Sequence, residues 1–98
     1  MSLRKLIFTL AAAAALDSIS GDEKKQVDKV LELLRHPVST RPKRLTVFRS
    51  RLAPKRYIVR VTSSLRIVYH RVSAKELLID DVYRKGAVDG LLKRRNSK

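Results

Sequence analysis

The first half of the chain has the pattern of a strand followed by two helices. Residues 3–9 are rich in Leu, Ile, Phe and Thr, which favour a strand, and the alanines after them favour a helix over Ala11–Ile19. A second helix is predicted from a stripe of apolar residues at i, i+3, i+4 and i+7, namely Val27, Val30, Leu31 and Leu34. Ser20 and Glu23 have the spacing of a capping box at its start, and Pro37 ends it.

The second half of the chain changes to a period of two, which is typical of strands. The segments with this alternation are Arg44–Arg49, Arg56–Thr62, Leu65–Arg71 and Leu77–Arg84. The short Ser63-Ser64 connection predicts a hairpin between the second and third of them. Ala87–Arg95 is expected to form a short final helix or an ordered tail.

Helices first and strands afterwards predict an α+β fold. We expect an N-terminal strand and an α-helical hairpin packed on one face of an antiparallel β-sheet, with the other face open to solvent. The length suits a single domain over residues 1–98. The expected core consists of Ile7, Leu16, Ile19, Val27, Val30, Leu31, Leu34, Val59, Val61, Ile67, Tyr69 and Ile79.

The N-terminal segment allows a second interpretation. Arg4 and Lys5 followed by the apolar run Leu6–Leu16 have the form of a secretory signal. The order of residue types, strand formers before helix formers, and the lack of cysteines favour the strand and helix instead. We therefore expect Met1–Leu16 to be retained and the protein to be cytoplasmic. The run is also too short to span a membrane.

Charge narrows the class of partner. The formal net charge is +14, and the segment of 43 residues from Leu33 to Lys75 has no acidic residue. One-signed charge repels itself, so this segment predicts a polyanionic partner rather than only a solvated surface. The candidate RNA-binding residues in it are Arg41, Lys43, Arg44, Arg49, Arg51, Lys55 and Arg56. With no Cys and only two His, we expect no metal site and no cofactor.

Two strand segments carry a resemblance to a known family. Arg56-Tyr57-Ile58-Val59-Arg60-Val61, followed by Leu65-Arg66-Ile67-Val68-Tyr69, resembles the central hairpin of the RelE/ParE toxins. Residues 80–85 (DDVYRK) fill the place of that family's last strand, which ends in a basic residue. The order of elements along nearly the whole chain is similar as well.

The resemblance implies a function. RelE-like members cut messenger RNA in the ribosomal A site without a metal, ParE-like members poison DNA gyrase, and an antitoxin silences both. The compact helical segment, residues 11–36, favours the RelE-like branch. The expectation is thus a type II toxin, a metal-free and ribosome-dependent mRNA endoribonuclease that inhibits translation. Its expected partners are an acidic antitoxin, in a hetero-oligomer, and the ribosome with its mRNA, with no membrane involved.

The same resemblance suggests the catalytic residues. Arg60, Arg66 and Arg84 match positions where RelE-like members keep basic residues, which would position phosphates and stabilise transition-state charge. Alternation places His70 on the same strand face as Arg66, where it could act as acid or base, although a lone strand histidine often has no role. Tyr83 is a further candidate, with a core or interface aromatic as the alternative.

Departures from the family pattern keep other functions open. Ile58 stands where a Lys is expected, and Tyr83 precedes the last basic residue instead of following it. Asp80 and Asp81 are the only acids near this site and can pair with its arginines. The alternatives are a ParE-like gyrase poison, a catalytically inactive toxin homologue, or a small non-enzymatic RNA-binding protein that uses the basic segment 41–56.

Overall fold

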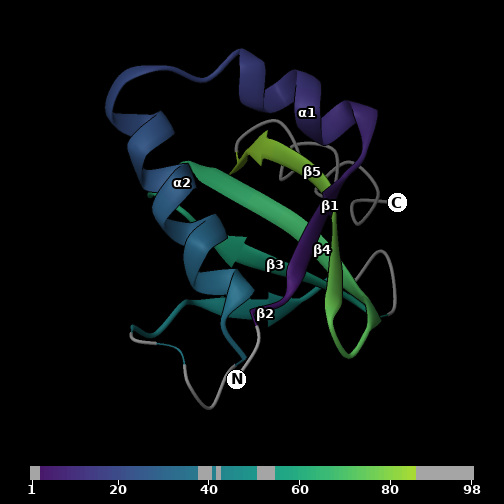
Figure 1. The fold of residues 1–98 in the computed structure, drawn as a ribbon. Coiled ribbons are helices and arrows are strands. Elements are labelled where there is room, and N and C mark those ends of the chain that lie inside the picture. The colour runs from purple at the N-terminus through teal and green to yellow at the C-terminus, as the bar shows by residue number, and fades with distance from the viewer. Residues whose placement is uncertain (1–2, 38–40, 42, 51–54, 86–98) are drawn as a thin grey trace, which may run out of the picture.

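The computed structural model describes residues 3–37, 41, 43–50 and 55–85. Its elements follow the expected order of strand, helices and strands (Figure 1). They are β1 (Lys5–Phe8), α1 (Leu10–Asp17), α2 (Gly21–Arg35), β2 (Val47–Arg49), β3 (Arg56–Arg60), β4 (Leu65–Ser73) and β5 (Glu76–Arg84). The α+β class is confirmed. The expected C-terminal helix at Ala87–Arg95 lies outside the described residues.

The strands form one five-stranded sheet in the order β1-β5-β4-β3-β2. From β5 to β2 all neighbours are antiparallel, and the predicted hairpin of β3 and β4 is confirmed, with Tyr57 opposite Tyr69. The expectation of a wholly antiparallel sheet is wrong at one edge, where β1 runs parallel to β5 with Lys5 opposite Glu76. Parallel neighbours need a long connection, and here the two helices and three strands between β1 and β5 form it.

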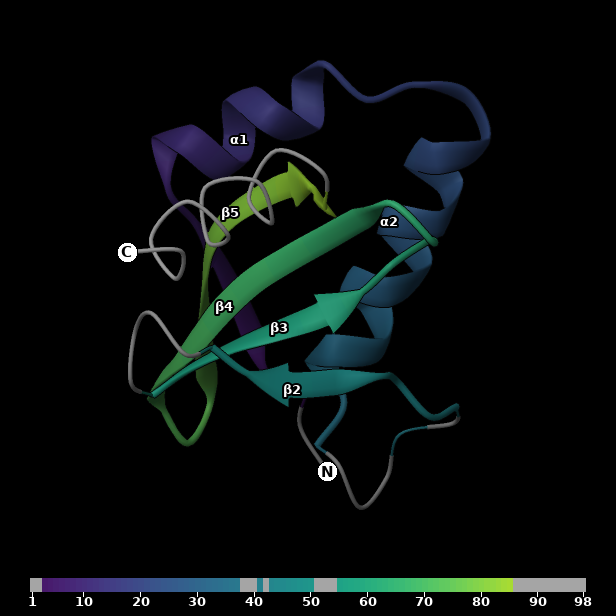
Figure 2. The same cartoon turned by 180° about the vertical axis from the view of Figure 1, so that it is seen from behind.

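The two helices do not lie side by side as the short connection had predicted. Figures 1 and 2 agree that α1 lies across the end of the sheet near β5, whereas α2 runs down one face of the sheet. Ser20, between the helices, has an extended backbone with φ −140° and ψ 173°, which turns the chain away from α1. Gly21 then begins α2 with φ +65°, a value that favours glycine.

Side-chain caps at the two helix starts differ from the sequence prediction. Ser20 is the N-cap residue of α2, but its side chain makes no capping hydrogen bond, so the predicted capping box is not formed. Thr9, in contrast, caps α1: its hydroxyl accepts a hydrogen bond from the Ala12 amide at 3.0 Å. The same hydroxyl donates to the Asp80 carbonyl at 2.7 Å, which ties the start of α1 to β5.

The core lies between α2 and the sheet, as predicted. Seven of the expected core residues are buried, namely Val27, Val30, Leu34, Val59, Ile67, Tyr69 and Ile79. Leu16, Ile19, Leu31 and Val61 are partly buried and pack against this cluster. From β1 it is Leu6, rather than the expected Ile7, that packs against it. We call the side of the sheet that α2 covers the helix face.

The N-terminal segment forms part of the fold. Residues 5–8 are paired in the sheet and residues 10–17 are helical, so the strand-and-helix interpretation is confirmed. Across the part of the chain that the structure describes, no helix combines the length and apolar character that crossing a membrane requires.

Candidate functional site

The face of the sheet opposite α2 carries most of the sequence-predicted catalytic residues. Figure 2 looks onto this face, with α2 behind the sheet. We call it the open face, because no described helix covers it. Strand register places its side chains in rows, since directly paired residues point to the same side.

Three rows cross the open face. Arg60, Arg66 and Tyr83 form the arginine row. The apolar row consists of Phe48, Ile58 and Val68, and Asp81 pairs with Val68 at its β5 end. Arg56, His70 and Leu78 form the histidine row. The arginine and histidine rows are four residues apart along β4, which is about 13 Å at the usual rise of a strand.

Arg60 and Arg66 share a row but have different surroundings. The Arg60 side chain is exposed, and no hydrogen bond or ion pair engages it within the described residues. Arg66 is only 7% exposed. Its guanidinium donates to the carbonyls of Thr62 at 2.6 Å, Leu65 at 3.1 Å and Ser63 at 3.4 Å. Arg66 therefore closes the β3–β4 turn, whereas Arg60 is accessible to a ligand.

His70 lies in a chain of contacts that joins three strands. Its Nδ1 is 2.8 Å from Asp80 Oδ2, and the same oxygen is 3.4 Å from Arg56 Nε. The Asp80 side chain is 16% exposed, so this carboxylate is held between the two other side chains and largely removed from water. The sequence predicts pairing of Asp80 or Asp81 with the arginines of the catalytic set. Asp80 instead contacts Arg56, which the sequence assigned to RNA binding.

A bulge in β5 brings two adjacent acids to the open face. The pairing of β4 with β5 shifts between Val68 and Tyr69, so that Asp80 has no directly paired residue on β4. Alternation from Leu78 places Asp80 on the open face, and the extra residue in the strand places Asp81, opposite Val68, on the same face. Asp81 accepts a hydrogen bond from the Val82 amide at 2.8 Å, and Asp80 remains available to His70.

Arg84 is not brought together with the other candidates. It pairs with the buried Leu65, which places it on the helix face. There its guanidinium donates to both carboxylate oxygens of Glu23 on α2, at 2.8 and 2.9 Å. The bond from Arg84 lowers the pKa of Glu23 and raises the pKa of Arg84. Glu23, which the sequence assigned to a capping box, serves this ion pair instead.

The described residues of the predicted RNA-binding set lie in or next to β2 and β3, except Arg41. Lys43, Arg44, Arg49 and Lys55 are exposed there, and Arg56 adjoins His70, while Arg51 lies outside the described residues. Arg41 is engaged in the fold: its Nε donates to the Leu33 carbonyl at 3.1 Å, at the C-terminus of α2. Arg4 donates to the His36 carbonyl nearby, and burial, together with the charge of Arg41, lowers the pKa of Arg4.

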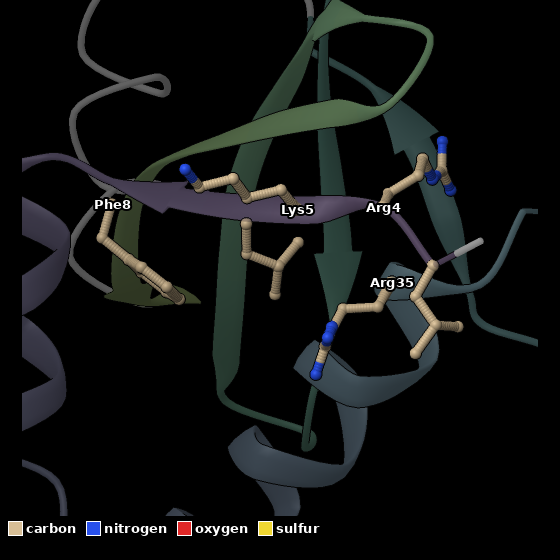
Figure 3. Close-up of a pocket in the computed structure, with 6 residues that line it drawn as sticks. Arg4, Lys5, Phe8 and Arg35 are labelled. Atoms are coloured by element: carbon tan, nitrogen blue, oxygen red, sulfur yellow. The ribbon is translucent and has the colours of Figure 1, made fainter.

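A shallow hollow lies away from these candidates, along β1 (Figure 3). Basic side chains of Arg4, Lys5 and Arg35 surround apolar ones of Leu3, Leu6 and Phe8. None of the predicted catalytic residues lines it. The described residues contain no group of three His, Asp or Glu side chains placed to hold a metal ion.

Two features that sequence reasoning missed shape the open face. The contact of Asp80 with His70 joins two strands, and the only local signal for it was a pair of adjacent acids within the otherwise apolar segment 77–83. The apolar row was hidden because Phe48, Ile58 and Val68 belong to three separate strands.

The mixed sheet with α2 on one face has the RelE-like α+β architecture, and the comparisons with known proteins agree on this fold. The chain is similar to the structure of a RelB-RelE antitoxin-toxin complex from Methanococcus jannaschii, with 13% identity, 87% of this chain and 96% of that chain covered, and a TM-score of 0.67. It is also similar to an archaeal RelE-RelB complex from Pyrococcus horikoshii. The identity there is 18%, the match covers 88% of this chain and 98% of that chain, and the TM-score is 0.65.

A third solved structure, a YoeB/ParE toxin from Agrobacterium tumefaciens, matches at 15% identity, covering 82% of this chain and 96% of that chain with a TM-score of 0.61. At these identities the likeness shows a shared fold, so the RelE-like architecture is confirmed. No protein-family model matches the sequence, and no curated protein does either.

Proposed function

We propose that this protein is the toxin of a type II toxin–antitoxin system and that it cleaves ribosome-bound messenger RNA. The observation that carries the proposal is the open face of a RelE-like sheet, where the accessible Arg60 and the His70–Asp80 pair stand on either side of an apolar row. The solved structures with this fold are described as toxins or as toxin–antitoxin complexes, which supports the same role here.

RNA cleavage needs a group that accepts the 2′-hydroxyl proton and positive charge around the phosphate. A histidine such as His70 can accept and donate a proton in this step, whereas Arg cannot readily do so. Arg56 lies next to His70 and supplies charge at the scissile phosphate. Arg60, about 13 Å away along the sheet, binds a neighbouring phosphate. Bases between these phosphates can stack on Phe48, which is 46% exposed in the apolar row.

The assignment of catalytic residues changes with this geometry. His70 becomes the proton-transferring residue, and Arg60 and Arg56 bind RNA. Arg66 holds the β3–β4 turn, and Arg84 holds α2 on the sheet through Glu23. Tyr83 pairs with Arg66 in the arginine row, where its hydroxyl is a further candidate for contact with RNA.

One observation favours a toxin that does not cut RNA. Ile58 lies in the apolar row at the centre of the open face, where the resemblance expects a basic residue. A gyrase poison of the ParE type, or a toxin homologue without catalysis, needs no proton-transferring group at that position.

The partner that silences the toxin is an acidic antitoxin. A net charge of +14 favours such a partner, and two of the similar structures are complexes of a toxin with its antitoxin. We expect the antitoxin to cover the open face and the basic residues around the β2–β3 end of the sheet. The complex would then form in the cytoplasm, where the ribosome and mRNA are the targets.

Expression of the chain from an inducible promoter tests this function. Growth, incorporation of labelled amino acids, mRNA 5′ ends and plasmid supercoiling are measured after induction. We expect growth and translation to stop with new mRNA ends, and Arg60→Ala to relieve the arrest. Lys29→Ala, an exposed cation on α2, is the matched control and should behave as wild type. An arrest with DNA breaks or altered supercoiling but intact mRNA would instead establish the gyrase branch.

A further inference from the structure

The placement of Asp80 has a chemical consequence for His70. Asp80 Oδ2 is 2.8 Å from His70 Nδ1, and the two side chains are 16% and 27% exposed. An ionised carboxylate only accepts hydrogen bonds, so Nδ1 must donate and must carry the proton. The Nε2 atom of a neutral imidazole then has a free lone pair. Within the described residues, no hydrogen bond engages Nε2.

The carboxylate itself is held in place from two sides. Arg56 Nε lies 3.4 Å from Asp80 Oδ2 and balances its charge. The Asp80 backbone is fixed by the Thr9 hydroxyl, which donates to its carbonyl at 2.7 Å, and by the Thr9 amide, which donates to the Ile79 carbonyl at 3.2 Å. The backbone at Asp80 is therefore anchored to the start of α1.

We propose that Asp80 is the positioning residue of the open-face site, which fixes the tautomer and the ring orientation of His70 so that Nε2 can take a proton from the substrate. This inference rests on the proposed RNA-cleaving function. His70 is the catalytic residue, and Asp80 acts only through it.

The step balances with water as the only additional reactant. Nε2 accepts the proton of a ribose 2′-hydroxyl while the 2′-oxygen forms a bond to phosphorus. The bond from phosphorus to the 5′-oxygen breaks, and that oxygen takes a proton from water. The products are a 2′,3′-cyclic phosphate and a 5′-hydroxyl, and the imidazolium returns its proton to the hydroxide that remains. Asp80 stabilises the imidazolium that forms in this step.

The structure offers a matched pair of variants for the test. Asp80→Asn keeps the shape of the side chain and removes its charge, so that Nδ1 no longer needs to be the protonated nitrogen. Asp81→Asn makes the same change one residue further along β5, where the carboxylate bonds to the Val82 amide and does not contact His70. Melting temperatures of both variants show whether the bulge survives.

Two readouts are compared. The first is the tautomer of the neutral His70 ring in the free protein, measured from the ¹⁵N chemical shifts of its two nitrogens. We expect the Nδ1–H form in wild type and in Asp81→Asn, and a mixture of tautomers in Asp80→Asn. The second is the rate of cleavage of ribosome-bound mRNA, which should fall about 10-fold or more in Asp80→Asn, since loss of an orienting carboxylate can cost up to about 10⁴-fold.

The outcomes separate this proposal from the function on which it rests. If wild type cleaves RNA but the His70 tautomer or the rate is the same in Asp80→Asn, the positioning role of Asp80 is wrong and the proposed function stands. An equal loss of rate in Asp81→Asn also overturns the proposal, because the loss would then not depend on the contact between the carboxylate and His70. A wild-type protein that leaves RNA intact overturns both.

Discussion

At the scale of single residues, the two arginines of the arginine row show how a shared strand face can hide different roles. Alternation correctly places Arg60 and Arg66 on one side of the sheet. It cannot show that the Arg66 side chain folds back over the β3–β4 turn, where three carbonyl groups accept from it. Arg60 has no such partners in the described chain and stays exposed.

We predict that Arg66→Ala lowers the free energy of unfolding by about 1–3 kcal/mol, because the carbonyls of the β3–β4 turn lose a charged donor. Arg60→Ala, the control from the same row, should change it by less than about 0.5 kcal/mol, as for other exposed positions. Urea unfolding followed by circular dichroism measures both. Equal stability of Arg66→Ala and wild type would mean that the guanidinium is free to bind a ligand.

At the scale of elements, α2 is attached to β5 by the ion pair of Glu23 and Arg84. Because Arg84 lowers the pKa of Glu23, this contribution to stability is present above the ordinary pKa of 4.5 and is lost as the pH falls through the lower, folded-state pKa. The pair is exposed, so it should also weaken as salt is added.

Arg84→Gln should therefore melt below wild type at neutral pH, and the difference should vanish in acid once Glu23 is protonated. Arg35→Gln is the control, because Arg35 pairs with Glu32 within α2 and joins no separate elements. Melting temperatures between pH 7 and about pH 2 decide this. A difference that persists unchanged in acid would show that Arg84 stabilises the fold without Glu23.

Most elements of the fold could be predicted from the sequence because they follow from local periodicity. The apolar stripe of α2 and the alternation of β3 and β4 each depend on neighbours a few residues apart. The parallel pairing of β1 with β5 joins Lys5 to Glu76, and nothing local encodes it. The capping box failed for the same reason: Glu23 found a partner 61 residues away in Arg84.

The candidate site could be predicted only in part. His70 and Arg60 were predicted as site residues by type and strand face, whereas the contact of Asp80 with His70 joins two strands and has no local pattern. Arg41 and Arg84 were counted among the functional cations, but both hold parts of the fold together. A basic residue that binds a backbone carbonyl or an acid looks the same in a sequence as one that awaits a ligand.

At the scale of the whole molecule, a net charge of +14 should make binding to nucleic acid strongly dependent on salt. If Arg56, Arg60 and one further cation contact phosphates, the logarithm of the affinity for a single-stranded RNA should fall with the logarithm of salt with a slope of about −2. Fluorescence anisotropy with a labelled oligonucleotide measures this slope. Arg60→Ala should make this slope shallower by about 0.7, and Lys29→Ala, on the far side of α2, should leave the slope unchanged.

The central claim is that the open face cleaves messenger RNA on the ribosome. Purified protein is incubated with ribosomes carrying a defined mRNA, and the 5′ ends of the RNA are mapped by primer extension. We predict new ends that require the ribosome, that persist in Lys29→Ala, and that disappear in His70→Ala. Arg56→Ala, which removes the charge beside the scissile phosphate, should slow their formation by about 10²–10³-fold, as expected for loss of a charge-stabilising donor. Intact mRNA with the wild-type protein, or cleavage that is undiminished in His70→Ala, would contradict the claim.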